Sequence, residues 1–260
     1  MKIALCQVPV LWESPEENLS NYDKIVERII QRDSGTDIII FPEFFSVGFS
    51  MNKAMCESLD GISAKWLRQK SSDSGIAFLA SIPIKASDKL YNRAIFVTPD
   101  GFEYYYDKRH IFSIGGENNI FSPGANKVII PYRGWNILIQ ICYDLRFPVW
   151  SRNTDLEYDL VINVANWPAT RAFVIEPMVK TRAIENLSYY AFVNRIGEDP
   201  GNIYEGNSMV SDFKGNSLEP CISDSSFNYS IFELDLNSLK SFRNKFPVWK
   251  DADKFSIEID

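Results

Sequence analysis

The sequence contains a single histidine, His110, among 260 residues. This scarcity excludes a metal site built from several histidines, and a Ser-His-Asp or Cys-His catalytic machinery would have to use His110. The four cysteines, Cys6, Cys56, Cys142 and Cys221, form no Cys-x-x-Cys pair, which argues against a zinc knuckle or a redox dithiol. We therefore expect reduced thiols and a cytoplasmic location.

Long hydrophobic segments are also lacking. No run of about eighteen apolar residues is present, so the sequence predicts no transmembrane helix. The start, MKIALCQVPVLWE, lacks the apolar segment and cleavage site of a signal peptide and is typical of a first strand. The formal net charge is −7 and the basic residues are scattered, which disfavours nucleic acid and anionic membranes as partners.

Several well-known catalytic motifs are absent as well. The chain has no Gly-x-Ser-x-Gly elbow, no Walker A loop, no Gly-x-Gly-x-x-Gly fingerprint and no His-Glu-x-x-His pair. Serine-hydrolase chemistry, nucleotide hydrolysis and dinucleotide redox chemistry all lose support.

Strand-like and helix-like segments alternate along the whole chain. Apolar runs predict strands at 3–8, 37–41, 76–84, 91–98, 102–107, 127–132, 135–142, 158–165, 189–196, 207–213 and 227–234. Helical spacing of apolar residues predicts helices near 14–30, 62–73 and 173–187, with Pro177 in the first turn of the last helix or kinking it. We expect one α/β domain over residues 1–260 with a layered sheet core. The polar and aromatic residues 237–260 would form a C-terminal tail that packs on the core or on a partner subunit.

Four segments place an ionisable group at the end of a predicted strand or in the loop beyond it. They are IIIFPEFFSVGFS with Glu43, EYYYDKRHIF with Lys108, IGGENNIFSPG with Glu117, and ILIQICYDLRFP with Cys142. Strand ends in α/β proteins carry ligand sites, because the loops there stand on a rigid scaffold. Each residue alone also has an ordinary interpretation, as a solvated acid, a surface charge or a small buried side chain. Their conjunction favours a catalytic set.

The chemistry of such a set is acyl transfer through a thioester. The thiol of Cys142 needs a base, and Glu43, flanked by phenylalanines, would have a pKa raised by burial. Lys108 would donate a hydrogen bond to an oxyanion, and the backbone N–H of Tyr143 would be a second donor.

These segments resemble the nitrilase or carbon–nitrogen hydrolase superfamily, which uses a Glu–Lys–Cys triad on an α-β-β-α sandwich. The resemblance extends over nearly the whole chain and includes ANWP at 165–168, RAIEN at 182–186 and FRNKFPVWKDADKF at 242–255. The GFSMN segment after Glu43 and the aromatic tail are similar to the omega-amidase branch. That resemblance implies deamidation of 2-oxoglutaramate or 2-oxosuccinamate without a metal or cofactor.

The resemblance also implies roles for individual residues. Glu43 matches the general base, Lys108 the oxyanion stabiliser and Cys142 the nucleophile, while Glu117 matches an assisting carboxylate. Arg146 would support the catalytic loop through an acid such as Glu117, and Arg171 would bind the substrate carboxylate. Further substrate contacts are expected from Phe49, Asn166 and Trp167, although core packing also explains the two aromatic residues. His110 is expected to be a local hydrogen-bonding group.

Other functions remain open at the level of the sequence. The same triad would serve N-carbamoyl compounds, aliphatic amides or nitriles, because loop shape sets specificity. A non-catalytic interaction protein on the same scaffold is an alternative of another class, and a metal hydrolase is a poor third. The resemblance implies a homodimer. The other expected partners are a small-molecule amide substrate and water.

Overall fold

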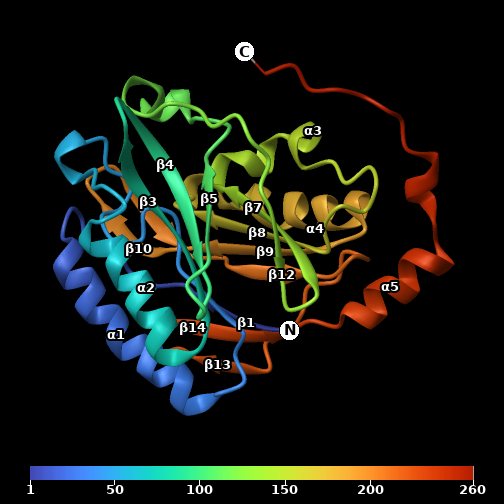
Figure 1. The fold of residues 1–260 in the computed structure, drawn as a ribbon, viewed down its shortest axis with the longest axis horizontal. Helices are drawn as coiled ribbons and strands as arrows, with labels where there is room; N and C mark the ends of the chain where they lie inside the picture. Colours follow the sequence, from blue (N-terminus) through green and yellow to red (C-terminus); the bar gives the residue numbers. More distant parts are fainter. Residues whose placement is uncertain (260) are drawn as a thin grey trace.

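Residues 1–259 are described by the structure, a computed structural model, in which two large β-sheets are stacked face to face (Figure 1). The first sheet has seven strands in the order β13 (Ile222–Asp224), β14 (Tyr229–Glu233), β1 (Lys2–Cys6), β2 (Ile38–Ile40), β3 (Ala77–Ala86), β4 (Lys89–Val97) and β5 (Glu103–Asp107). The second has five strands in the order β12 (Met209–Ser211), β9 (Tyr189–Asn194), β8 (Leu160–Ala165), β7 (Trp135–Ile141) and β6 (Ile129–Tyr132).

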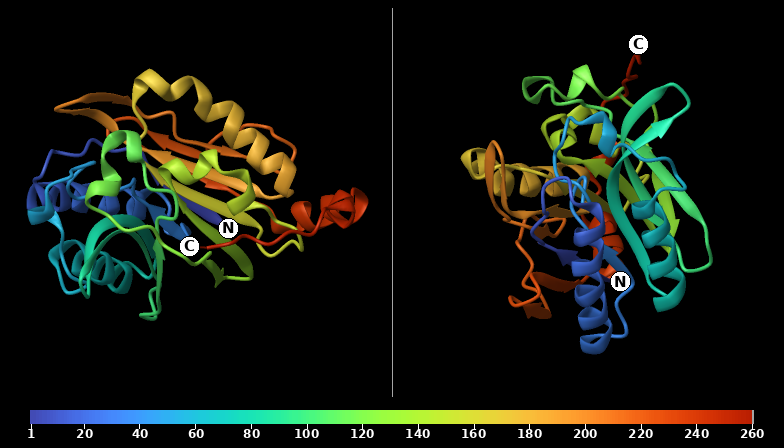
Figure 2. Two further views of the ribbon diagram at one scale, coloured as in Figure 1. Left: turned by 90° about the horizontal axis from the view of Figure 1, so that it is seen from above. Right: turned by 90° about the vertical axis from the view of Figure 1, so that its left-hand side faces the viewer.

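Helices cover the outer face of each sheet, as the further views show (Figure 2). Helices α1 (Pro15–Arg32) and α2 (Ile62–Ser74) pack on the first sheet. Helix α4 (Ile175–Asn186), with the short α3 (Pro148–Ser151) beside it, packs on the second. The predicted α-β-β-α sandwich is therefore confirmed.

Strand β1 shows how the sequence builds these layers. Successive side chains of a strand point to opposite faces of the sheet. Ile3 and Leu5 belong to the apolar cluster between the two sheets, whereas Ala4 and Cys6 belong to the cluster under α1 and α2. A strand that is buried on both faces needs apolar residues at every position, which explains the continuous apolar runs in the sequence.

Strand direction brings several loops to one edge of the sandwich. Strands β1, β2 and β3 are parallel, and β5 runs the same way as β3 because each is antiparallel to β4. Strands β7, β8 and β9 are also parallel to one another. The segments that follow β2, β5, β7 and β8 therefore meet, and they carry the ionisable residues picked out in the sequence.

The structure contains elements that the sequence did not predict, and it places Pro177 at one of the two expected positions. A hairpin of β10 (Ile196–Asp199) and β11 (Asn202–Glu205) was not predicted, because its short strands carry few apolar residues. Strand β13 lies in a polar segment that had no assigned structure. Pro177 is the third residue of α4 and so lies in the first turn, where a missing N–H breaks no helical hydrogen bond.

The C-terminal region begins with helix α5 (Leu236–Lys245), which is packed on the core. Arg243 of this helix forms a buried ion pair with Asp159, with 2.6 Å between Nη1 and Oδ1. Residues 252–259 have no regular secondary structure and extend away from α5 (Figure 1). Among the described residues, no helix is long and apolar enough to span a membrane.

Candidate active site

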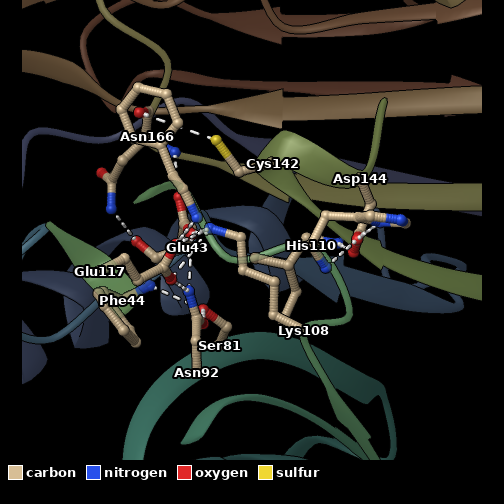
Figure 3. Close-up of polar contacts among 12 residues, drawn as sticks. Glu43, Phe44, Ser81, Asn92, Lys108, His110, Glu117, Cys142, Asp144 and Asn166 are labelled. Atoms are coloured by element: carbon tan, nitrogen blue, oxygen red, sulfur yellow. Dashed lines mark hydrogen bonds and ion pairs between the residues drawn. The ribbon is translucent and has the colours of Figure 1, made fainter. Parts of the chain in front are cut away.

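Glu43, Lys108, Glu117 and Cys142 lie together at the shared edge of the two sheets (Figure 3). They come from four separate segments of the chain, and the two carboxylates and the ammonium are completely buried. A buried charge is costly unless it is paired, so this cluster must be internally compensated.

Glu43 follows β2 and is held by three donors. Its Oε1 accepts from Asn92 Nδ2 at 2.7 Å and from Lys108 Nζ at 2.8 Å, and its Oε2 accepts from the backbone N–H of Asn166 at 2.9 Å. Burial raises the pKa of Glu43, and the charge of Lys108 only partly opposes this effect. The carboxylate is therefore a better proton acceptor than an exposed glutamate.

Lys108 follows β5 and lies between two carboxylates. Its Nζ is 2.8 Å from Glu43 Oε1 and 2.9 Å from Glu117 Oε2. Burial lowers the pKa of Lys108, but Glu117 and Glu43 together outweigh burial and raise the pKa above its ordinary value. The ammonium is therefore charged at neutral pH and has fixed orientation.

Glu117 is the second carboxylate of the cluster and makes more contacts than a loop acid requires. It accepts from Lys108 through both oxygens, from Asn92 Nδ2 at 3.0 Å, and from the backbone N–H of Phe112 at 2.7 Å. It lies at the start of a short 3₁₀ helix, Glu117–Asn119. The interpretation of Glu117 as a solvated loop acid is wrong.

Cys142 stands at the junction between β7 and a 3₁₀ helix, Cys142–Arg146. Its backbone has a φ of +43°, a conformation that residues other than glycine rarely adopt. Cys142 is 9% exposed and lines a cavity. Burial raises the pKa of the thiol, Glu43 raises it further, and Lys108 opposes both. The resting thiol is therefore protonated and requires a base to react.

Tyr143 follows the thiol within the same short helix. The first N–H groups of a helix have no partner within it, so the N–H of Tyr143 is available to an acceptor beside Cys142. Its ring packs against Phe112 and Phe147, with centroids 5.0 and 5.1 Å away. The ring contacts fix the turn that carries the thiol.

A cavity of about 610 Å³ opens above these residues. Its floor includes Lys108 and Cys142, and Arg146 and Arg171 add two further cations to its lining. The unpredicted β10–β11 hairpin forms part of the wall through Asp199 to Asn202 and Tyr204. The remaining wall is mainly apolar and is formed by Trp12, Phe49, Met51, Phe112, Ile114, Gly115, Trp167 and Pro168, with Tyr143 and Asn166.

The structure places the other predicted substrate contacts on this cavity. Phe49 lies over the Lys108 ammonium, with 5.6 Å from Nζ to the ring centroid. Asn166 also donates its side-chain Nδ2 to the carbonyl of Glu43 at 2.8 Å. Trp167 donates its indole N–H to the carbonyl of Arg171 at 2.8 Å. Trp167 is thus both a buried residue and a cavity wall.

The expected contact between Arg146 and Glu117 is wrong. Within residues 1–259, the polar partners of Glu117 are Lys108, Asn92 and the N–H of Phe112. Arg146 instead lies over the ring of Trp167, with 4.9 Å from Cζ to the centroid, and lines the cavity. The two oxygens of Glu117 already accept four hydrogen bonds, from Lys108, Asn92 and the N–H of Phe112, so no acceptor position is left for a guanidinium.

Asn92 is a site residue that the sequence did not reveal. It lies on β4, donates to both Glu43 and Glu117, and accepts from Ser81 at 2.9 Å. It stands between Tyr91 and Arg93 within a strand, and an amide at such a position gives no local signal of its partners. Only the pairing of β3 with β4 places it beside the carboxylates.

Known proteins are similar to this chain in sequence and in fold over almost its whole length. Residues 2–244 match the carbon–nitrogen hydrolase family. The omega-amidase YafV of Yersinia enterocolitica is 40% identical over 99% of this chain and 98% of its own, and that of Escherichia coli K12 is 37% identical with the same coverage. The 2-oxoglutaramate amidase of Bacillus subtilis is 26% identical over 97% of both chains. The crystal structure of XC1258 from Xanthomonas campestris, a CN-hydrolase superfamily protein with an arsenic adduct in the active site, has a TM-score of 0.92 at 34% identity over 99% of each chain. The chain therefore belongs to the carbon–nitrogen hydrolase family and is a hydrolase of carbon–nitrogen bonds.

Proposed function

We propose that this protein is an omega-amidase that releases ammonia from the terminal amide of a small 2-oxo acid, of the 2-oxoglutaramate or 2-oxosuccinamate type. The observation that carries the proposal is the buried Lys108 ammonium, held between Glu43 and Glu117 beside the thiol of Cys142. The identity with omega-amidases over almost the whole chain supports the substrate class.

Acylation begins with proton transfer from Cys142 to Glu43. The thiolate attacks the amide carbon, and the carbonyl oxygen becomes an oxyanion that accepts hydrogen bonds from Lys108 and from the N–H of Tyr143. Glu43 then gives its proton to the departing nitrogen. The C–N bond breaks, ammonia leaves, and a thioester remains on Cys142.

Deacylation uses the same groups in the opposite sense. Glu43 accepts a proton from water, and the resulting hydroxide attacks the thioester carbon. The second oxyanion is held by the same two donors, Lys108 and the N–H of Tyr143. The C–S bond breaks, Cys142 recovers its proton from Glu43, and the carboxylic acid product gives its remaining acidic proton to solvent water as it leaves. Neither half-reaction requires a group outside the chain and water.

Glu117 serves the reaction mainly through Lys108. Because Glu117 compensates the ammonium, Lys108 stays charged when Glu43 is protonated during the cycle. The contact of Glu117 with the N–H of Phe112 also anchors the cavity wall. Its role is therefore electrostatic support and positioning.

The substrate carboxylate is bound by Arg171, with Arg146 near it on the same cavity. Both guanidinium groups line the cavity, and neither forms an ion pair with a carboxylate among residues 1–259. A guanidinium with no internal counter-charge is suited to an anionic ligand. Phe49, Asn166 and Trp167 form the walls that orient the chain between the amide and the carboxylate.

Ammonia release from 2-oxoglutaramate tests this function, with glutamine, an N-carbamoyl amino acid, an aliphatic amide and a nitrile as competing substrates. Turnover of the 2-oxo amide that is lost in Cys142→Ala is expected. Preferred turnover of another compound would replace the substrate and keep the triad. A folded enzyme with an unreactive Cys142 and no turnover would favour a non-catalytic protein.

We also propose that the protein is a homodimer located in the cytoplasm. A homodimer is supported by exposed apolar residues near the C-terminus, Phe246, Val248, Phe255, Ile257 and Ile259. Light scattering tests it, and a fully active monomer would contradict it. A cytoplasmic location is supported by four free cysteines and would be tested by fractionation of cells.

A further inference from the structure

We propose that Asp144 and His110 are positioning residues that fix the position of Lys108 relative to Cys142 across the two sheets. The inference rests on the roles proposed above for Lys108 and Cys142. Neither Asp144 nor His110 lines the cavity, so neither touches substrate. Figure 3 shows the pair beside the segment that carries Cys142.

The Asp144 carboxylate is completely buried and accepts four hydrogen bonds. Its Oδ2 accepts from the hydroxyl of Tyr106 at 2.7 Å and from the N–H of Ile141 at 2.9 Å. Its Oδ1 accepts from the backbone N–H of His110 at 3.0 Å and contacts His110 Nδ1 at 2.7 Å. All four acceptor positions of the carboxylate are therefore used.

These donors come from both sheets. Tyr106 lies on β5 of the first sheet, two residues before Lys108, and His110 lies two residues after it. Ile141 ends β7 of the second sheet and directly precedes Cys142. One carboxylate thus ties the chain on both sides of Lys108 to the chain on both sides of Cys142. The relative position of ammonium and thiol is set by this tie.

His110 completes the contact through its ring. A carboxylate only accepts, so Nδ1 of His110 carries the proton in this hydrogen bond. The ring is stacked on Phe147 with centroids 3.7 Å apart and planes 4° apart. Phe147 directly follows the 3₁₀ helix that begins at Cys142. His110 therefore contacts the segment 142–147 at two places, by the hydrogen bond to Asp144 and by stacking on Phe147.

A turn of this kind needs external support. Cys142 has a positive φ, and such a backbone conformation persists only where the surrounding contacts determine it. The hydrogen bond from Ile141 to Asp144 closes the turn from within, and the bonds from Tyr106 and His110 fix it to the other sheet. Without these hydrogen bonds, the catalytic groups would still be present, but Lys108 and Cys142 would be displaced from each other. A displacement of about 1 Å costs about a hundred-fold in rate.

Two substitutions of His110 separate positioning from packing. His110→Asn keeps a donor near the position of Nδ1 but loses the stacked ring. His110→Phe keeps a ring against Phe147 but loses the donor. Steady-state ammonia release is measured for both, together with alkylation of Cys142 by iodoacetamide. His110→Phe is expected to lower kcat and the alkylation rate about ten-fold or more, with KM within about three-fold, and His110→Asn to recover most of the loss.

Asp144→Asn tests the acceptor directly, and Asp159→Asn is its matched control. Asp159 is also a buried carboxylate that accepts from a backbone N–H and a side chain, but it precedes β8 at the opposite end of the strands from Asn166. Asp144→Asn is expected to lose about a hundred-fold in kcat, whereas folded Asp159→Asn keeps wild-type kcat.

Equal kcat and alkylation rates in wild type, His110→Phe and His110→Asn would overturn the inference. So would an equal loss of kcat in Asp144→Asn and Asp159→Asn. The proposed function fails by different results in the wild-type enzyme and in Cys142→Ala: preferred turnover of another compound, no turnover with an unreactive Cys142, or turnover that survives in Cys142→Ala. The two failures are therefore distinguishable.

Discussion

The ammonium of Lys108 lies 2.8 Å from Oε1 of Glu43, and both side chains are completely buried. This pair belongs to a cluster with two carboxylates and one cation, because Glu117 lies on the other side of the ammonium. Lys108 is thus the only cation in direct contact with these carboxylates among residues 1–259. Stability and reactivity both depend on it.

Lys108→Met is expected to destabilise the fold by about 3–5 kcal/mol, because it leaves buried carboxylates without a counter-charge. It also removes the charge that opposes burial, so the pKa of Glu43 rises further. A carboxyl group with a raised folded-state pKa loses stability as pH rises, so the destabilisation is expected to be larger near pH 8 than near pH 5. Urea unfolding at both pH values measures it.

Lys127→Met is the matched control for that experiment. Lys127 forms an ion pair with Glu157 at 2.7 Å, but this pair is partly exposed. Its loss is expected to cost at most about 1 kcal/mol with no effect on turnover. Equal destabilisation by the two substitutions would contradict the central role of Lys108.

The pKa of the Cys142 thiol is expected to respond in opposite directions to two substitutions. Burial and Glu43 raise this pKa, whereas Lys108 lowers it. Glu43→Gln removes a negative charge, so the pKa falls, while Lys108→Met removes a positive charge, so the pKa rises. The pH midpoint of alkylation by iodoacetamide measures both, with the Cys142 peptide followed by mass spectrometry. Shifts in the same direction would show that the two charges do not act on the thiol as the structure places them.

Glu43→Gln is also expected to lower kcat for ammonia release by about 10²–10⁴-fold, although its thiol ionises more readily. The reason is that the amide side chain of this variant accepts no proton from the thiol and returns none to the leaving nitrogen. The single-turnover rate of acylation measures this step. A variant with a lower thiol pKa and undiminished acylation would show that Glu43 is not the base.

The sequence predicted the residues that follow strands and missed those that lie within them. Glu43, Lys108 and Cys142 were predicted to lie together because each stands at or just beyond the end of a predicted strand, and the sheets bring those ends to one edge. Asn92 gave no signal, because it lies within a strand and its partners are distant in sequence. Periodicity shows which face a residue occupies, but not which residue lies opposite it.

The lining of the cavity was predictable only in part. The β10–β11 hairpin was missed because its strands have four residues each and lie largely in solvent. Arg146 was assigned to Glu117, although Lys108, Asn92 and the N–H of Phe112 already occupy the oxygens of that carboxylate. Competition between nearby charges depends on distances that the sequence does not contain. Loop geometry, and with it specificity, therefore needed the structure.

Arg171→Met is expected to raise KM for 2-oxoglutaramate by about ten- to a hundred-fold. The reason is that one charge-assisted hydrogen bond to the substrate carboxylate is lost, which costs about 1.5–3 kcal/mol. The kcat/KM for butyramide, which has no carboxylate, is expected to stay within about two-fold. Arg146→Met is the matched comparison, since both arginines line the cavity. A larger effect on KM in Arg146→Met would assign the carboxylate to Arg146, and an equal loss with butyramide would contradict carboxylate binding by Arg171.

Gly124→Ala is expected to disturb the site from outside the cavity. The N–H of Gly124 donates to the carbonyl of Lys108 at 2.9 Å, and a methyl group at Gly124 would lie 2.1 Å from the carbonyl oxygen of Asp107. The backbone that carries Lys108 must therefore move, at a cost of about 1–3 kcal/mol. We expect a lower Tm and at least a ten-fold lower kcat. Gly35→Ala is the control, because the atom nearest to its new methyl group is a side-chain oxygen of Asp33 that can turn aside. Wild-type kcat in Gly124→Ala would show that Lys108 tolerates a displaced backbone.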